Sequence, residues 1–254
     1  GAQPGTARWS LRLAGIGESE AAARLVDVEK ALAADPGASI DYLPGPALLE
    51  VRLAVHRSSA DDARRALQGH VDAAVHALGE ELYGQDEDTL ASVVIRSLVA
   101  RQATCAIAES LTGGLVGAAI TDVPGSSAAF LGAVVAYATE LKAQLLGVPP
   151  AHLAERGAVD PSTAVLMAEG VRDRLAATFG LATTGVAGPD PQEGRPPGTV
   201  HVAVAGPGGH RVRSLELPGD RDFVRRLTVV LALDLLRRTL AGDESLGSFV
   251  RRRL

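Results

Sequence analysis

The stretch Ala108-Glu109-Ser110-Leu111-Thr112-Gly113-Gly114 decides the fold of the larger part of this chain. A strand-like apolar run over 104–108 leads into it, and a run with helical periodicity over 115–120 leads out of it. A serine, a threonine and two glycines therefore stand where a strand turns into a helix. Such a turn exposes backbone N–H groups beside the positive end of the helix dipole. This geometry is typical of an anion site, for a bound phosphate or for the oxyanion of an attacked amide.

Composition argues against several classes of protein. The 254 residues are 46% apolar, which is enough for one large core or two smaller ones. The net charge of −5 and the aromatic content of 3% argue against a nucleic-acid partner, and no apolar run is long enough to span a membrane. One cysteine, Cys105, and no signal segment predict a reducing, cytoplasmic location. No spacing of histidine and cysteine indicates a metal site. Because the first residue is Gly1, we expect a piece of a longer protein.

Residues 1–84 predict a small α+β domain. The pattern is strand, helix, two strands and helix, over 9–13, 20–34, 38–42, 47–56 and 61–78. This order resembles an RNA-binding KH module, which holds the phosphate backbone with a basic Gly-x-x-Gly loop. The corresponding loop here carries Glu18 and Glu20, so we expect no nucleic-acid binding through it.

Residues 85–254 predict a three-layer α/β/α domain with a mixed sheet. Strands alternate with helices, and a hairpin and a last helix complete the pattern, over 199–205, 211–217 and 220–240. The run from Phe130 to Ala138 is almost wholly apolar, which predicts a strand buried on both faces. Asp160 and Pro161 are typical helix-start residues, and we expect their helix to continue to about Phe179.

Ser110 is the candidate nucleophile, and a serine hydroxyl needs a base to become reactive. No Gly-x-Ser-x-Gly elbow surrounds it, and the six histidines stand in contexts typical of structural or exposed residues. The remaining base is Lys142, which with Lys30 makes up all the lysine among 25 basic residues. A buried lysine can lose its proton near neutral pH, whereas an arginine cannot. The alternative is that Ser110 only caps the helix that follows.

Two more polar clusters fall near the ends of predicted strands. The run Thr184-Gly185-Val186-Ala187-Gly188-Pro189-Asp190 follows a strand, and its glycines let a ligand approach the backbone. Arg221 and Arg225 share one helical face, where they can hold a phosphate or pair with the aspartates around them. The proline-rich loop over 185–198 lies between the two clusters and has the character of a lid.

In this order the motifs resemble the C-terminal domain of the CinA family over about residues 86–243. The resemblance rests on 108–114, 124–127, Phe130, Tyr137, Lys142, 157–159, 184–189, 198–200 and 219–221. Residues 8–84 are similar to the small domain that precedes it in full-length members. Those members also carry an upstream molybdopterin-binding-like domain with a separate pyrophosphatase activity, and this sequence does not include it.

The resemblance implies a nicotinamide mononucleotide deamidase of pyridine nucleotide (NAD) recycling. The enzyme hydrolyses the carboxamide of its small-molecule substrate to nicotinate mononucleotide and ammonia, with no metal or cofactor. Ser110 is then the nucleophile, and Lys142 and Tyr137 are its activating pair. The N–H groups of Thr112, Gly113 and Gly114 would stabilise the oxyanion. The residues implied to hold the substrate are Thr184, Gly185, Arg221 and Arg225.

One position departs from the family pattern, because Leu111 stands where the family usually has cysteine. Activity can survive this change, since the cysteine is not the assigned nucleophile, but a larger side chain there can reshape the pocket. The competing hypothesis is a non-catalytic mononucleotide-binding module that uses the Ser110 turn as an anion nest. We also expect a homodimer, and an assembly role for residues 1–84. Hydrogen-bond reach between Ser110 and Lys142 is the spatial test of the enzymatic reading.

Overall fold

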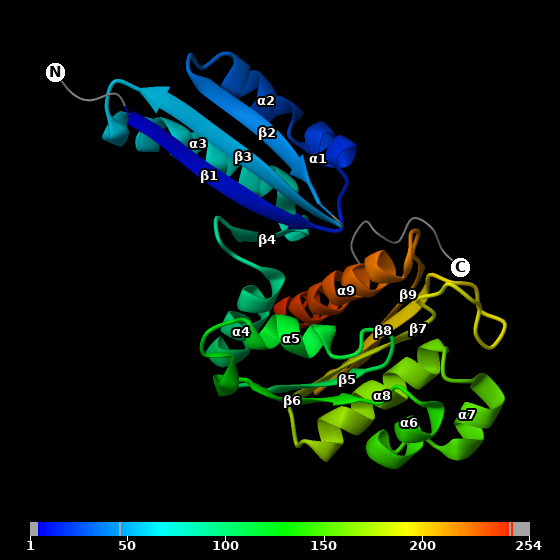
Figure 1. Cartoon of the computed structure of the whole chain (residues 1–254). Helices are drawn as coiled ribbons and strands as arrows, with labels where there is room; N and C mark the ends of the chain where they lie inside the picture. The colour runs from blue at the N-terminus through cyan, green and yellow to red at the C-terminus, as the bar shows by residue number, and fades with distance from the viewer. Residues whose placement is uncertain (1–4, 46, 244, 246–254) are drawn as a thin grey trace. The chain divides into compact units, whose positions relative to one another are not determined.

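We describe the protein from a computed structural model, which defines residues 5–45, 47–243 and 245 (Figure 1). The chain folds as two compact units, the first ending at Thr89 and the second beginning at Leu90. The change between them lies just after β4 (Leu82–Gln85), close to the predicted boundary after residue 84. Each unit contains its own sheet, so each can be described by itself.

The first unit is an antiparallel sheet with helices on one face (Figure 1). Its strand order is β2-β3-β1-β4, and apolar side chains of β1 and β3 pack with the helices in one core. The elements before β4 are β1 (Gly5–Ala14), α1 (Glu18–Arg24), α2 (Val26–Ala33), β2 (Ala38–Pro44), β3 (Leu48–Arg57), α3 (Ala60–Leu78) and a 3-10 turn (Gly79–Glu81). The single helix expected over 20–34 is two helices that meet at the buried Leu25.

The second unit has three layers around a five-stranded mixed sheet of order β6-β5-β7-β8-β9. Strands β6, β5 and β7 run parallel, whereas β8 and β9 are antiparallel to their neighbours. In Figure 1, α4, α5 and α9 lie on one side of the sheet and α6, α7 and α8 on the other. This confirms the predicted three-layer α/β/α fold. The bounds are α4 (Leu90–Ala100), β5 (Cys105–Glu109), α5 (Leu115–Thr121), a 3-10 turn (Ser126–Ala128), β6 (Phe130–Val135), α6 (Thr139–Leu146), α7 (Pro150–Arg156), α8 (Pro161–Arg174), β7 (Phe179–Gly185), β8 (Thr199–Gly206), β9 (Gly209–Glu216) and α9 (Arg221–Ala241).

Two predicted elements differ from the structure. The strand expected over 130–138 ends at Val135, and it is half exposed rather than buried on both faces. It is an edge strand of the sheet, so the helix layers cover it incompletely, and Leu131 remains 46% exposed. The helix expected to reach Phe179 ends at Arg174 instead. The chain then joins the sheet, because the Phe179 amide donates to the Thr104 carbonyl.

A buried ion cluster fixes α9 to the sheet. Asp234 of α9 is fully buried and accepts hydrogen bonds from three arginines, Arg213 of β9 at 3.4 Å, Arg237 at 2.7 Å and Arg238 at 3.0 Å. Charge-assisted bonds of this kind are strong when both partners are removed from water. The Arg213–Asp234 contact joins β9 to α9, whose first two turns carry Arg221 and Arg225.

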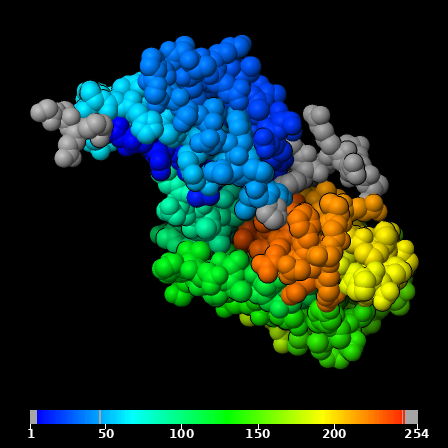
Figure 2. All heavy atoms as spheres, turned by 45° about the horizontal axis from the view of Figure 1, so that its top comes forward, coloured from blue at the N-terminus to red at the C-terminus, as the bar shows by residue number. Residues whose placement is uncertain are grey.

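The loop between β7 and β8 forms a separate bulge on the surface. Figure 2 shows it in yellow beside the orange atoms of the C-terminal part of the second unit. A hydrogen bond from the Leu217 amide to the Gly198 carbonyl joins the end of this loop to the segment after β9. The proline-rich loop over 185–198 therefore lies at the surface of the same unit as the Ser110 turn.

Candidate functional site

Ser110 is held at the carboxyl end of β5, in the middle of the parallel part of the sheet. β5 is fully buried between β6 and β7, and the Ser110 amide donates to the Thr183 carbonyl at 3.0 Å, which extends the β5–β7 pairing by one residue. The chain then turns into α5 through Gly113 and Gly114, whose φ angles are +60° and +99°. Only glycine adopts this left-handed conformation without strain. The strand–turn–helix arrangement predicted from the sequence is therefore present.

Lys142 lies within hydrogen-bond distance of Ser110. Its Nζ is 3.2 Å from Ser110 Oγ and 2.9 Å from the carbonyl oxygen of Ala136, and its side chain is only 1% exposed. Burial lowers the pKa of Lys142 to about 8, although the nearby carboxylates of Glu193 and Glu140 partly oppose the shift. At pH 7 roughly a tenth of the amine is then neutral and able to take a proton. The two residues form a hydroxyl–amine pair with the geometry of a nucleophile and its base.

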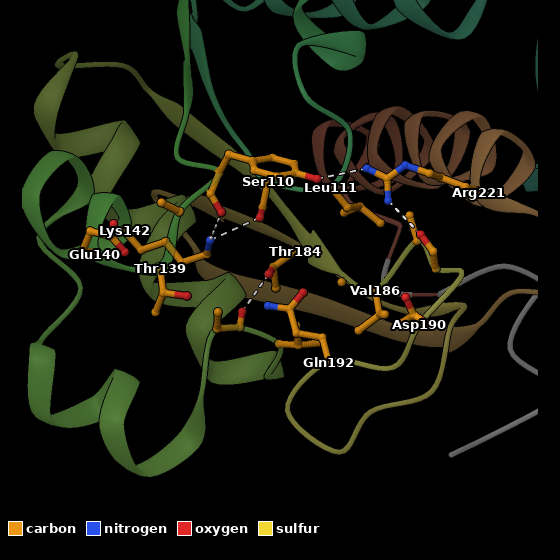
Figure 3. Close-up of a pocket in the computed structure, with 17 residues that line it drawn as sticks. Ser110, Leu111, Thr139, Glu140, Lys142, Thr184, Val186, Asp190, Gln192 and Arg221 are labelled. Atoms are coloured by element: carbon orange, nitrogen blue, oxygen red, sulfur yellow. Dashed lines mark hydrogen bonds between the residues drawn. The ribbon is translucent and has the colours of Figure 1, made fainter.

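Tyr137 stands next to this pair, but its hydroxyl faces away from it. Its backbone carbonyl oxygen is 3.5 Å from Lys142 Nζ, whereas its hydroxyl accepts a hydrogen bond of 3.0 Å from Arg221 Nη2 (Figure 3). The structure thus differs from the expected activating pair of Lys142 and Tyr137. The phenol group contacts the cation at the other end of the site, and Lys142 faces Ser110 without it.

The N-terminus of α5 already holds an anion, the side chain of Glu109. Its fully buried carboxylate accepts from the amides of Gly114 at 2.9 Å, Val116 at 3.1 Å and Gly117 at 2.8 Å. The Gly113 amide donates to the Ser110 carbonyl at 3.1 Å. Gly113 and Gly114 were expected to hold the oxyanion, and the structure gives both amides internal partners instead. Within the described residues, the amides of the turn without a hydrogen-bond partner are those of Leu111 and Thr112.

Arg225 and the side chain of Thr112 hold the turn from outside the cavity. Arg225 Nε donates to the Leu111 carbonyl at 3.0 Å, and its Nη2 donates to the Thr112 carbonyl at 3.0 Å. The Thr112 hydroxyl is 2.8 Å from the Thr183 hydroxyl, in the interior of the domain. Neither Arg225 nor Thr112 lines the cavity described next. Arg225, which we expected to hold substrate, contacts the backbone of the turn in this structure.

The Ser110–Lys142 pair opens into a cavity of about 400 Å³ (Figure 3). Such a volume is within the range of small-molecule sites. Thr184 and Gly185 at the end of β7 line it, as expected, and the Thr184 hydroxyl donates to the Ala158 carbonyl at 2.7 Å. Arg221 lines its far side and donates to the Gly188 carbonyl at 2.9 Å. The other lining residues are Leu111, Tyr137, Ala138, Thr139, Glu140, Val159, Val186, Ala187, Asp190 and Gln192.

Several of these residues were not singled out from the sequence. Glu140 and Gln192 line the cavity, and Glu193 attaches the loop to the rest of the domain by accepting from the Val159 amide at 3.1 Å. A side chain at Gly157 would collide with Glu193, since an added Cβ would lie 2.3 Å from its Oε2. The position of Glu140 in the same helix turn as Lys142 was the available signal for it. The contact of Glu193 depends on how the loop folds back, which no local pattern indicates.

Other kinds of site are not seen in the described part of the chain. None of the residues that line the cavity is a histidine. Among the residues 5–45, 47–243 and 245, no group of three His, Cys, Asp or Glu side chains is placed to hold a metal ion. Within the same ranges, no helix has the length and apolar character needed to cross a bilayer.

Comparisons with known proteins cover both units. The profile of the CinA C-terminal domain matches residues 87–240, and that of the damage-inducible protein CinA KH domain matches residues 8–84. A CinA-like protein of Frankia casuarinae is 50% identical over 91% of this chain and 54% of its own length. A putative competence-damage inducible protein of Desulforamulus reducens is 38% identical over 92% of this chain and 56% of its own length. The chain thus spans about half the length of these relatives.

Two solved structures of CinA superfamily proteins each match about three fifths of this chain. A CinA superfamily protein of Klebsiella pneumoniae superposes with a TM-score of 0.59 at 32% identity, over 60% of this chain and 96% of that protein. A CinA superfamily protein of Escherichia coli superposes with a TM-score of 0.57 at 30% identity, over 63% of this chain and 96% of that protein.

Proposed function

Because the chain belongs to the CinA family, whose KH and C-terminal domains match it in order, we propose that its second unit is a nicotinamide mononucleotide deamidase. The reaction converts the carboxamide of nicotinamide mononucleotide to the carboxylate of nicotinate mononucleotide and releases ammonia. The observation that carries the proposal is the buried Ser110–Lys142 pair, with 3.2 Å between Oγ and Nζ, at the end of a cavity large enough for a small ligand. This reaction would serve the recycling of pyridine nucleotides.

The first step is attack of Ser110 Oγ on the carboxamide carbon. Neutral Lys142 accepts the hydroxyl proton as the C–O bond forms, which the lowered pKa of about 8 makes accessible near neutral pH. The resulting lysine ammonium then donates the proton to the leaving nitrogen, and ammonia departs from the tetrahedral intermediate. Water, deprotonated by the same amine, cleaves the acyl–serine ester and restores the Ser110 hydroxyl.

The oxyanion needs N–H donors near Ser110. Among the described residues, the amides of Leu111 and Thr112 directly follow the nucleophile and have no other partner. We assign the oxyanion to the amide of Leu111, which lines the cavity, with the neighbouring Thr112 amide as a second donor, in place of Gly113 and Gly114, whose N–H groups are used inside the turn. The Thr112 N–H lies in the peptide plane whose Leu111 carbonyl accepts from Arg225, and the Leu111 N–H lies in the plane whose Ser110 carbonyl accepts from the Gly113 amide, so both donors are held in place.

The phosphate of the mononucleotide needs a cation at a distance from the reacting carboxamide. Arg221 lines the cavity on the side away from Lys142 and makes two hydrogen bonds to neutral oxygens, those of Gly188 and Tyr137. It forms no ion pair in the described structure, so its charge is available to a phosphate.

The test is ammonia release from nicotinamide mononucleotide by Ser110→Ala and Lys142→Met variants. We expect both to lose at least about a hundredfold in kcat, which is typical for loss of a nucleophile or its base. Lys30→Met and Ser39→Ala are matched controls, because both residues are exposed in the first unit. Unchanged rates in both site variants would refute the proposal.

A second candidate, a non-catalytic mononucleotide-binding module, is separated by the same measurements. Leu111 lines the cavity and is 4% exposed, so the residue that departs from the family pattern touches the ligand space. Calorimetric binding of nicotinamide mononucleotide with no ammonia release by the unmodified chain would select the binding module over the enzyme.

A further inference from the structure

Tyr137 is the only aromatic residue among the described residues that line the cavity. It is also 58% exposed, so its ring contributes little to the core. The expected role in activating Ser110 does not account for it, because its hydroxyl bonds Arg221. Its aromatic face is therefore a part of the site that the proposed mechanism leaves unused.

The residue connects the two ends of the site. Its backbone carbonyl lies 3.5 Å from Lys142 Nζ at the reacting end, and its hydroxyl lies 3.0 Å from Arg221 Nη2 at the far end. A mononucleotide with its carboxamide at Ser110 and its phosphate at Arg221 must lay its pyridine ring between these points. The hydrogen bond from Arg221 holds the phenol group at one end of this path.

We infer that Tyr137 is the platform for the positively charged pyridinium ring, and that the cavity selects a cationic ring over a neutral one of the same shape. The inference rests on the proposed function and adds the charge of the ring as a determinant of specificity. The face of an aromatic ring carries negative potential and attracts a cation placed over it. Tyr137 is then a specificity-determining residue in addition to a partner of Arg221.

Acidic side chains also lie around the cavity. Carboxylates of Glu140 and Asp190 line it, and both are exposed at its rim. The two lining cations, Lys142 and Arg221, stand at opposite ends, where the carboxamide and the phosphate are expected. For a positive ring between them, the two carboxylates offset the repulsion from these cations, so the tyrosine face is the feature that distinguishes a cationic from a neutral ring.

The experiment measures binding, because the ring charge also changes the intrinsic reactivity of the carboxamide. The Ser110→Ala variant, which should bind without turnover, is titrated by calorimetry with two ligands. One is nicotinamide mononucleotide, and the other is benzamide riboside 5′-monophosphate, in which carbon replaces the charged ring nitrogen. We expect the cationic ligand to bind about fivefold more tightly, as one cation–π contact would produce. Tyr137→Leu, added to Ser110→Ala, should abolish this ratio. Tyr137→Phe should keep it, since the ring remains and only the hydroxyl on Arg221 is lost.

The outcomes separate this inference from the proposed function. Equal affinities for the two ligands, or a ratio that survives Tyr137→Leu, overturn the inference even if the unmodified chain releases ammonia. Absence of both ammonia release and ligand binding overturns the proposed function, and the inference with it. Because Tyr137 is largely exposed, neither replacement removes core packing, and a circular dichroism melt of each variant verifies that the fold is kept.

Discussion

At the scale of single residues, the protonation of Lys142 should determine how the rate of ammonia release depends on pH. Its pKa is lowered to about 8 by burial, so the neutral form grows as pH rises and is nearly complete above the pKa. We expect kcat/KM for ammonia release to rise about tenfold per pH unit below this value and to level off above it. Stopped assays over a buffer series measure the profile. A rate that is independent of pH, or that rises only near the ordinary lysine value, would contradict the role of Lys142.

Arg221 and Arg225 stand four residues apart on α9, yet the structure gives them different tasks. Arg221→Met should raise KM for nicotinamide mononucleotide by roughly tenfold to a hundredfold, the usual worth of a charge-assisted bond to phosphate. It should leave kcat/KM for nicotinamide riboside, which lacks the phosphate, nearly unchanged. Arg225→Met should instead lower kcat for both substrates, because it releases the carbonyls of Leu111 and Thr112. Steady-state kinetics on the two substrates test the contrast.

The pairing of Ser110 with Lys142 was predictable from single residues, whereas other contacts of the site were not. A serine at a strand-to-helix turn and a rare lysine after the next strand limit the choice of nucleophile and base. The hydroxyl of Tyr137 contacts a residue far along the chain, and nothing near it in sequence indicates that partner. The same holds for Glu109, whose identity alone does not reveal that it folds back onto the helix that follows.

At the level of secondary structure, the side chain of Glu109 joins the end of β5 to the start of α5. Glu109→Ala would leave the amides of Gly114, Val116 and Gly117 without their acceptor. We expect the free energy of unfolding to fall by about 2–4 kcal/mol, as for buried donors that lose their partners. Urea unfolding measures the change, and Glu87→Ala at an exposed position is the control. Equal loss in the two variants would show that the cap contributes nothing.

The elements were predicted more reliably than their surroundings. Periodicity indicates a strand over 130–135, but not whether that strand is central or at the edge, since apolar runs occur in both. β6 is at the edge, and its exposed side chains are therefore visible only once the sheet order is known. The end of α8 was misplaced for a related reason, because pairing with Thr104 draws the following residues into the sheet.

At the scale of the molecule, the second unit should work without the first. It has its own sheet and core, and the profile of the CinA C-terminal domain matches residues 87–240 within it. We expect a fragment of residues 86–245 to unfold cooperatively and to keep kcat/KM within about twofold of the full chain, since compact units with their own core can fold alone. Calorimetry and the ammonia assay test this. Loss of activity in a folded fragment would assign residues 1–84 a part in the reaction.

The carboxylate of Glu109 at the start of α5 also bears on how the product leaves. The proposed reaction turns a neutral amide into an anion directly beside Ser110. A helix start with unused N–H groups would retain that anion and slow each cycle. Glu109 already occupies the amides of Gly114, Val116 and Gly117, so the newly formed carboxylate finds only the amides of Leu111 and Thr112 open, beside the buried Glu109 carboxylate. If the proposed reaction takes place, we therefore expect nicotinate mononucleotide to inhibit it only weakly.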